Sequence, residues 1–488
     1  MLLALWIAGV FLAGLATMVA RVLPAILALP LMGIAIAGGA AVLSPDATAS
    51  DLFAGVIGAG SLRLHEAMVV ALFGGMLSSQ MQKSGTAESL VKGGAELFGE
   101  GPLAVSVLSM LLAALLFTSV GGLGAVILVA LVVLPVLATT GVEPVVAGGV
   151  LLFGISLGGT LNAGNWVVYQ STLGLAPNEV ASFALIVFLL TLAAGVAFVA
   201  IELARSGAER RPAHLAGWVL GTLSLAGLGA WLSVRGGTAE GPPAWKAPAQ
   251  LVLGGLFALL VAWIAIDALR RAPRWRREVA RVRPWAYLIP LVPLAGVVVF
   301  DLPVLPAFVI GIAYAWIATL RPGSLSMTVQ SLVEGAQSSI PAVLLMIGIG
   351  VLVTAVIGPA GRDGAWPVLA AIEPYVAACV PTTPLGYVVG FGLAAPLSLY
   401  RGPLNVWGLG FGTAAILTTS GGLPPAAAMA VLFSVGQVQG ICDPTNTANV
   451  WLANELRVDP QTLMLRLLPY AWALAFAGLA VGAALTMR

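Results

Sequence analysis

The stretch that decides the fold is GICDPTNTAN, residues 440–449, a dense polar run between two apolar segments. Pro444 has no backbone N–H and disfavours helical backbone at Asp443, so this run should interrupt a helix. In a membrane, irregular backbone persists only where protein buries it or where it lines a watery cavity. The run therefore predicts a binding site at a broken helix. An earlier run, GGTLNAGN at residues 158–165, has the same character and is its expected counterpart.

Composition indicates a membrane protein. Of the 488 residues, 60% are hydrophobic and only 9% are charged, whereas about a quarter of the residues in a soluble domain are charged. Apolar runs recur along the chain, and about 18 residues are enough to cross a hydrocarbon core of about 30 Å. We expect an all-α polytopic membrane protein with about 11 to 13 transmembrane helices. Such a protein lies in the lipid bilayer. Its net charge of +2 gives no reason to expect a nucleic-acid partner.

Two segments, residues 103–139 and 385–418, each contain two apolar arms joined by a Gly-rich or polar tip. The tips are TSVGG at residues 118–122 and YRGP at residues 400–403. Each segment could be two full crossings or one re-entrant hairpin. The short arms favour the hairpin.

Two blocks of the chain share one order of parts: hairpin, span, polar break, proline-marked turn and last span. Gly122 and Gly159 are 37 residues apart, and Gly402 and Gly440 are 38 apart. We therefore expect two structural repeats between scaffold helices. The predicted parts are N-terminal scaffold helices at 1–63, repeat 1 at 64–203, linking scaffold helices at 204–329 and repeat 2 at 330–488.

The basic loops predict the orientation of the chain. Arginines gather in the loops at 205–215 and 270–283, two spans apart, and Arg321 follows two further spans. The positive-inside rule places all three on the cytoplasmic side of the cell membrane. In a cell with two membranes, this is the inner membrane. The first repeat then ends inside and the second begins inside. Because each repeat has an odd number of crossings, they are inverted, as in secondary transporters with a site near the bilayer midplane.

Asp443 is the expected coupling residue, because a carboxylate in low dielectric tends to take a proton or a cationic partner. Thr445, Asn446 and Asn449 supply neutral oxygens that suit Na⁺ or a hydroxyl-bearing substrate. The alternative is that the run only caps a turn at the membrane surface.

The earlier break offers Thr160, Asn162 and Asn165 but no carboxylate. We expect Thr160 and Asn162 to help hold the coupling ion and the two asparagines to contact substrate. The alternative is a kinked helix whose polar groups are satisfied by neighbouring protein.

Arg401 at the second hairpin tip is the expected anion-binding residue, since a guanidinium holds a carboxylate through paired hydrogen bonds. Asn405 follows closely and would contribute to the same site. Gly121 and Gly122 would form an uncharged, anion-accommodating turn at the first tip. The alternative for Arg401 is a tip that reaches the membrane surface, where the side chain snorkels into water.

No phosphate-binding loop, HExxH, CxxC or nucleophile elbow occurs in a credible setting, and the chain has two histidines and two cysteines. We expect no enzyme, no cofactor and no metal other than a coupling Na⁺.

Two inverted blocks, each with a hairpin and a Gly/Asn/Thr-rich helix break, resemble the ion transporter superfamily. Its members include gluconate permeases, proton–citrate symporters and divalent anion–sodium symporters. In the dicarboxylate members, paired Ser-Asn-Thr signatures follow the hairpins, whereas the matching places here are TLN at 160–162 and TNT at 445–447. The resemblance implies a homodimer and alternating access.

Taken together, residues and resemblance predict an ion-coupled symporter of a small organic anion of the gluconate, citrate or dicarboxylate kind. The alternative is a Na⁺/H⁺ antiporter that uses Asp443 and no organic substrate. Arg401 separates the two, because a cation site should avoid a fixed positive charge. A membrane enzyme or an assembly scaffold would require a catalytic constellation that two isolated histidines do not supply.

Overall fold

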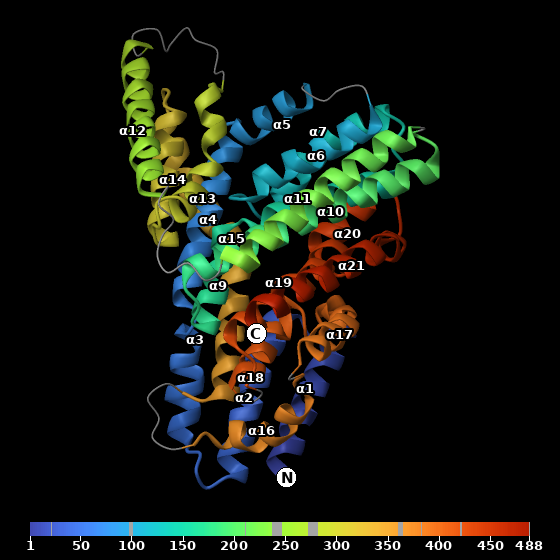
Figure 1. Ribbon diagram of the computed structural model, residues 1–488. Helices are drawn as coiled ribbons and strands as arrows, with labels where there is room; N and C mark the ends of the chain where they lie inside the picture. The colour runs from blue at the N-terminus through green and yellow to red at the C-terminus, as the bar shows by residue number, and fades with distance from the viewer. Residues whose placement is uncertain are drawn as a thin grey trace. The chain divides into compact units, whose positions relative to one another are not determined.

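A computed structural model describes residues 1–20, 22–96, 101–209, 211–236, 246–271, 282–359, 365–381, 383–419 and 422–487. Within these ranges all regular secondary structure is helical (Figure 1). The chain divides into two compact units. Unit 1 comprises residues 1–68, 168–194 and 341–488, and unit 2 comprises residues 69–167 and 195–340.

Unit 1 is built on two helices, α19 (Pro425–Cys442) and α21 (Pro460–Thr486), which pack along each other. They approach closely because Gly478 faces Ser434, and a Cβ at Gly478 would lie 2.4 Å from the serine Oγ. The second predicted hairpin packs on this pair through α17 (Pro384–Ala394) and η4 (Ala395–Arg401). The remaining elements are α1 (Leu2–Val19), α2 (Ala25–Leu43), η1 (Asp51–Ala59), α3 (Gly60–Leu62), α16 (Pro367–Cys379), η5 (Val406–Gly410), α18 (Phe411–Thr419) and α20 (Thr447–Glu455).

Unit 2 is organised around the packing of α6 (Pro102–Phe117) on α8 (Pro144–Thr160). Here too a glycine sets the separation, because a Cβ at Gly158 would lie 2.3 Å from the Ala114 carbonyl oxygen. The turn after α6 is held by hydrogen bonds from the Thr118 and Ser119 hydroxyls to the Pro290 carbonyl. The remaining elements are α5 (Thr86–Glu96), α7 (Leu123–Thr139), α11 (Pro212–Gly236), α12 (Lys246–Arg271), η3 (Pro284–Leu288), α13 (Leu291–Val298) and α14 (Val304–Ala318).

Four helices contribute residues to both units. They are α4 (His65–Lys83), α9 (Ala163–Leu173), α10 (Pro177–Ser206) and α15 (Ser324–Ile357).

The protein is an all-helical, multi-pass membrane protein, as predicted. Eight of the described helices are long and apolar enough to cross a membrane, or nine when the bent pair α8–α9 is one span. The estimate of about 11 to 13 crossings is higher because it includes segments that form shorter helices. Five apolar helices among the described residues are only 10–17 residues long, and they include both arms of the first predicted hairpin.

Both predicted hairpin tips fall at breaks in helical structure. The first lies between α6 and α7, where Gly122 has a φ of +84°. At the second, η4 ends at Arg401, and Tyr400 has a φ of +53°, a left-handed conformation that a tyrosine rarely adopts. Re-entry of these hairpins from one membrane face, and the boundaries of the repeats, remain predictions.

Candidate functional site

The polar run at 440–449 interrupts a helix, as predicted. Helix α19 ends at Cys442, and α20 begins at Thr447. Asp443, the C-cap residue of α19, is only 1% exposed. Its Oδ1 accepts hydrogen bonds from the Thr445 backbone N at 2.9 Å and from the Thr445 Oγ1 at 2.7 Å. The break therefore buries a carboxylate and holds it with local donors.

Asn405 ties the second hairpin to this break. The side chain is fully buried, and its Nδ2 donates to Asp443 Oδ2 at 3.3 Å and to the Ser398 carbonyl at 2.8 Å. A second link runs from the Val406 backbone N to Gln439 Oε1 at 3.1 Å. The structure thus brings together Asn405 and Asp443, two of the predicted site residues, from positions 38 residues apart in the chain.

Two buried acceptor oxygens of the predicted site have no hydrogen-bond partner among the described residues: the Oδ1 atoms of Asn405 and Asn449. Each of these amides uses its nitrogen, and Asn449 Nδ2 donates to the Ile441 carbonyl at 3.0 Å. An unpartnered buried polar atom is costly. Amide and carboxylate oxygens are ligands that hard cations accept, so an ion, a water or a substrate hydroxyl would satisfy them.

Two other residues of the predicted site are Asn446 and Arg401. Asn446 is half-buried and forms the N-cap of α20 without a side-chain capping bond. The Arg401 backbone ends η4, but its side chain lies outside the described part of the structure. Its role as the anion-binding residue therefore remains a prediction.

The second polar run, at 158–165, also breaks a helix as predicted, and α8 and α9 are bent by 55° there. Asn162 Oδ1 accepts from the Gly164 backbone N at 3.0 Å, which caps the start of α9. Asn162 Nδ2 donates to the Phe117 carbonyl at 3.2 Å, at the end of α6. This break is therefore also tied to the tip of its hairpin.

The remaining polar groups of this break bond to its own backbone. Asn165 Nδ2 donates to the Gly159 carbonyl at 3.0 Å, and Thr160 Oγ1 donates to the Leu157 carbonyl at 2.7 Å. The Trp166 indole donates to the Thr160 carbonyl at 2.8 Å. These bonds satisfy the end of α8 locally, which favours the kinked-helix interpretation for Thr160. Gly121 and Gly122 are exposed at the hairpin tip.

The two breaks share a pattern of contacts. In each, one asparagine joins the break to the hairpin, and another asparagine donates to a carbonyl at the end of the preceding helix. The likeness concerns these contacts alone, and the inverted repeat remains a prediction. The breaks lie in different units, so their meeting in one two-sided site remains a prediction.

Sequence reasoning missed three polar side chains of α19. Gln439 binds the hairpin backbone, as described above, and lies one helical turn before Asp443. Gln437 Oε1 accepts from Thr191 Oγ1 at 3.4 Å, and the buried Ser434 Oγ has no partner among the described residues. The sequence did contain a signal for these residues, because polar side chains within an apolar membrane span are costly and uncommon.

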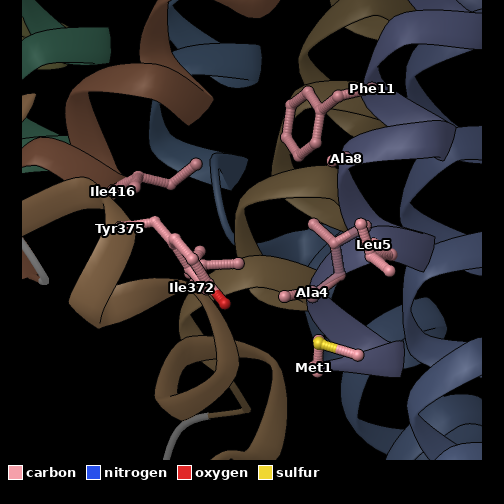
Figure 2. A pocket seen from close by; sticks show the side chains of 9 residues that line it. Met1, Ala4, Leu5, Ala8, Phe11, Ile372, Tyr375 and Ile416 are labelled. Carbon is pink, nitrogen blue, oxygen red and sulfur yellow. The ribbon is translucent and has the colours of Figure 1, made fainter.

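Metal-binding clusters and apolar cavities are two other kinds of candidate site. The described residues contain no group of three or more His, Cys, Asp or Glu side chains that could hold a metal ion. A cavity of about 360 Å³ lies in unit 1 among α1, α16 and α18. Figure 2 shows Phe11, Tyr375 and Ile416 around it, and its other lining side chains are those of Met1 and of aliphatic residues. Such a lining offers few groups to a charged substrate.

No family model and no curated protein matches this chain. Among solved structures, it is similar to the YdaH transporter of Alcanivorax borkumensis, with a TM-score of 0.47 and 17% identity over 94% of this chain and 96% of that one. It is also similar to Neisseria gonorrhoeae MtrF, described as illuminating a class of antimetabolite efflux pumps. That match has a TM-score of 0.41 and 15% identity over 91% of this chain and 85% of the other. Similarity at this level establishes neither a shared family nor a shared substrate.

Proposed function

We propose that this protein is a secondary active transporter, an ion-coupled symporter of a small organic anion of the gluconate, citrate or dicarboxylate kind. The observation that carries the proposal is Asp443, a buried carboxylate at a helix break that a hairpin residue, Asn405, contacts directly. Ionisable groups inside membrane proteins are expensive and usually belong to ion or substrate pathways. A break of this kind is where transporters place their sites.

Each side chain has a role in this proposal. Asp443 takes the coupling proton or holds Na⁺ with Thr445 and Asn446, and Arg401 neutralises the anion. The amides of Asn405 and Asn449 hold substrate oxygens or the ion, because each has an acceptor oxygen without a partner among the described residues. The first break contributes through Thr160, Asn162 and Asn165, together with the turn at Gly121 and Gly122. Alternating access moves the hairpins relative to the scaffold helices, and the chain works as a homodimer.

The runner-up is a Na⁺/H⁺ antiporter with Asp443 as the exchanging carboxylate. One observation favours it: the hydrogen bonds to the Asp443 carboxylate in the described structure come from the neutral groups of Thr445 and Asn405, and Asn405 also carries an acceptor oxygen without a partner among the described residues. Such a set suits a cation without an organic anion.

Transport in proteoliposomes tests both functions. The purified protein is reconstituted, and uptake of radiolabelled gluconate, citrate and succinate is followed under an imposed Na⁺ or pH gradient. The variants are Asp443→Asn and Arg401→Gln. Asp459→Asn is the matched control, because Asp459 is an exposed N-cap carboxylate on α21 and asparagine caps equally well.

Symport predicts gradient-driven accumulation of at least one anion, which is lost in the Asp443 and Arg401 variants and kept in the Asp459 control. Uptake that survives Asp443→Asn unchanged would refute the assigned site. Na⁺/H⁺ exchange without any anion, lost in Asp443→Asn and kept in Arg401→Gln, would establish the antiporter instead.

A further inference from the structure

A polar cavity of about 650 Å³ lies in unit 2, where α4 ends and α5 begins. Three cationic residues line it, Lys83, Lys92 and Arg321. Neither the transport proposal nor the repeat pattern uses these residues. The volume far exceeds the roughly 30 Å³ that one water occupies in the liquid, so the cavity can hold a polyatomic ligand.

The charges in the cavity do not balance. Lys83 Nζ lies 2.6 Å from Glu334 Oε1, and Lys92 Nζ lies 2.6 Å from Glu88 Oε1. Arg321 has no such carboxylate among the described residues, where its guanidinium donates to the Met327 sulfur at 3.6 Å. A thioether is a weak acceptor. One guanidinium therefore remains available to an anion, beside two lysines that could turn toward the same ligand.

The cavity is also lined by one carboxylate, Glu88, which pairs with Lys92, and by the neutral polar residues Gln82, Ser84 and Ser89. A guanidinium combined with ammonium and hydroxyl groups matches the many oxygens of a phosphate group. The donor set thus favours a phosphate over a simple halide, which has no need of forked donors.

The position of the cavity along the chain points to the membrane surface. Lys83 is the last residue of the apolar run at Asp51–Lys83, and Arg321 lies three residues before the span α15. Lipid headgroups lie at the ends of spans, and basic pockets between helices on the cytoplasmic side bind anionic headgroups. The positive-inside rule assigns Arg321 to that side.

We propose that this cavity binds a phosphate group, carried either by an anionic phospholipid headgroup or by a soluble phosphate compound. Arg321 supplies the uncommitted charge, and Lys83, Lys92 and the serine hydroxyls supply further donors. This site is independent of the proposed transport function, because none of its residues belongs to either helix break.

Binding measurements on the full-length protein in an uncharged detergent test the proposal. After delipidation, the protein is titrated with dioctanoyl phosphatidylglycerol, with dioctanoyl phosphatidylcholine and with inorganic phosphate, and binding is followed by microscale thermophoresis. The variants are Arg321→Gln and the double variant Arg321→Gln/Lys92→Gln. Arg211→Gln is the matched control, because Arg211 is an exposed arginine of the same predicted cytoplasmic side and does not line the cavity.

Near an anionic surface each basic residue contributes about 1 kcal/mol, equivalent to about a fivefold change in Kd. We expect phosphatidylglycerol to bind about fivefold more weakly to Arg321→Gln and about 25-fold more weakly to the double variant. The Arg211 control should bind like the unaltered protein. Competition by inorganic phosphate would identify a soluble phosphate site, and binding of phosphatidylglycerol without that competition would identify a headgroup site.

Three results would overturn the proposal. They are equal binding of phosphatidylcholine and phosphatidylglycerol, an equal loss in the Arg211 control, and no binding of either phosphatidylglycerol or phosphate. Arg321→Lys guards against a folding artefact, because it keeps the charge but loses the forked donors of the guanidinium. It should therefore bind more tightly than Arg321→Gln and more weakly than the unaltered protein.

Discussion

Gly158→Ala tests how the first hairpin is held against the broken helix. The added Cβ would lie 2.3 Å from the Ala114 carbonyl oxygen and 2.7 Å from the Phe117 Cβ. Ordinary contact begins near 3.4 Å, so α6 and α8 must separate by about 1 Å. The Asn162 Nδ2 to Phe117 carbonyl bond, already 3.2 Å long, would then exceed hydrogen-bonding distance.

The expected cost has two parts. Overpacking a close helix contact costs about 1–3 kcal/mol, and a lost side-chain hydrogen bond in a membrane protein costs about 0.6 kcal/mol on average. With an unfolding entropy of about 2 cal/mol/K per residue, this cost should lower the thermal midpoint by roughly 2–4 °C. The assay is thermal unfolding of the purified protein in detergent, followed by intrinsic fluorescence at one fixed scan rate.

Gly221→Ala on α11 is the control, because an added Cβ there has no atom within 4 Å. Alanine favours helix over glycine by up to about 1 kcal/mol, so this variant should keep or raise the midpoint. The reasoning would be refuted if Gly158→Ala melted at or above the temperature of the control, since the close approach of α6 and α8 would then not restrict side-chain size.

Three further predictions concern single contacts. Trp166→Phe removes the indole donor to the Thr160 carbonyl and should cost about 1 kcal/mol in a denaturant titration; an unchanged midpoint would show that water replaces the bond. Asn405→Ala takes a donor from the neighbouring carboxylate and should reduce both ion-driven transport and thermal stability; normal values of both would contradict the link between hairpin and break. Lys83→Gln removes the partly exposed contact with Glu334 and should change stability little, and any loss should vanish at 1 M NaCl, where charges are screened; a loss that persists in high salt would show that packing causes it.

Local sequence signals were enough to locate both helix breaks and both hairpin tips. A proline after Asp443, and glycines and asparagines around Asn162, change backbone preference within a few residues. The structure confirms both breaks. They could be predicted because each depends on residues that are neighbours in the sequence.

Contacts between distant residues could not be predicted in the same way. Nothing near Asn405 identifies Asp443 as its partner, because the packing of η4 on α19 sets that contact. The same is true of the Ser119 hydroxyl and the Pro290 carbonyl. Helical type could not be predicted either: residues 51–59 form a π-helix that continues without a break into α3. A window of apolar residues does not report such a change in helical type.

The division of unit 1 among three stretches of chain has a consequence for biogenesis. Its first 68 residues leave the ribosome long before residues 341–488, which supply α19 and α21. Unit 2 ends at residue 340, so all its helices are synthesised before the helices at the centre of unit 1 exist. The early helices α1 and α2 are therefore inserted into the membrane before the later segments of unit 1 are available to pack against them. Truncation after residue 340 should expose them to membrane quality-control proteases while leaving unit 2 with its full set of segments.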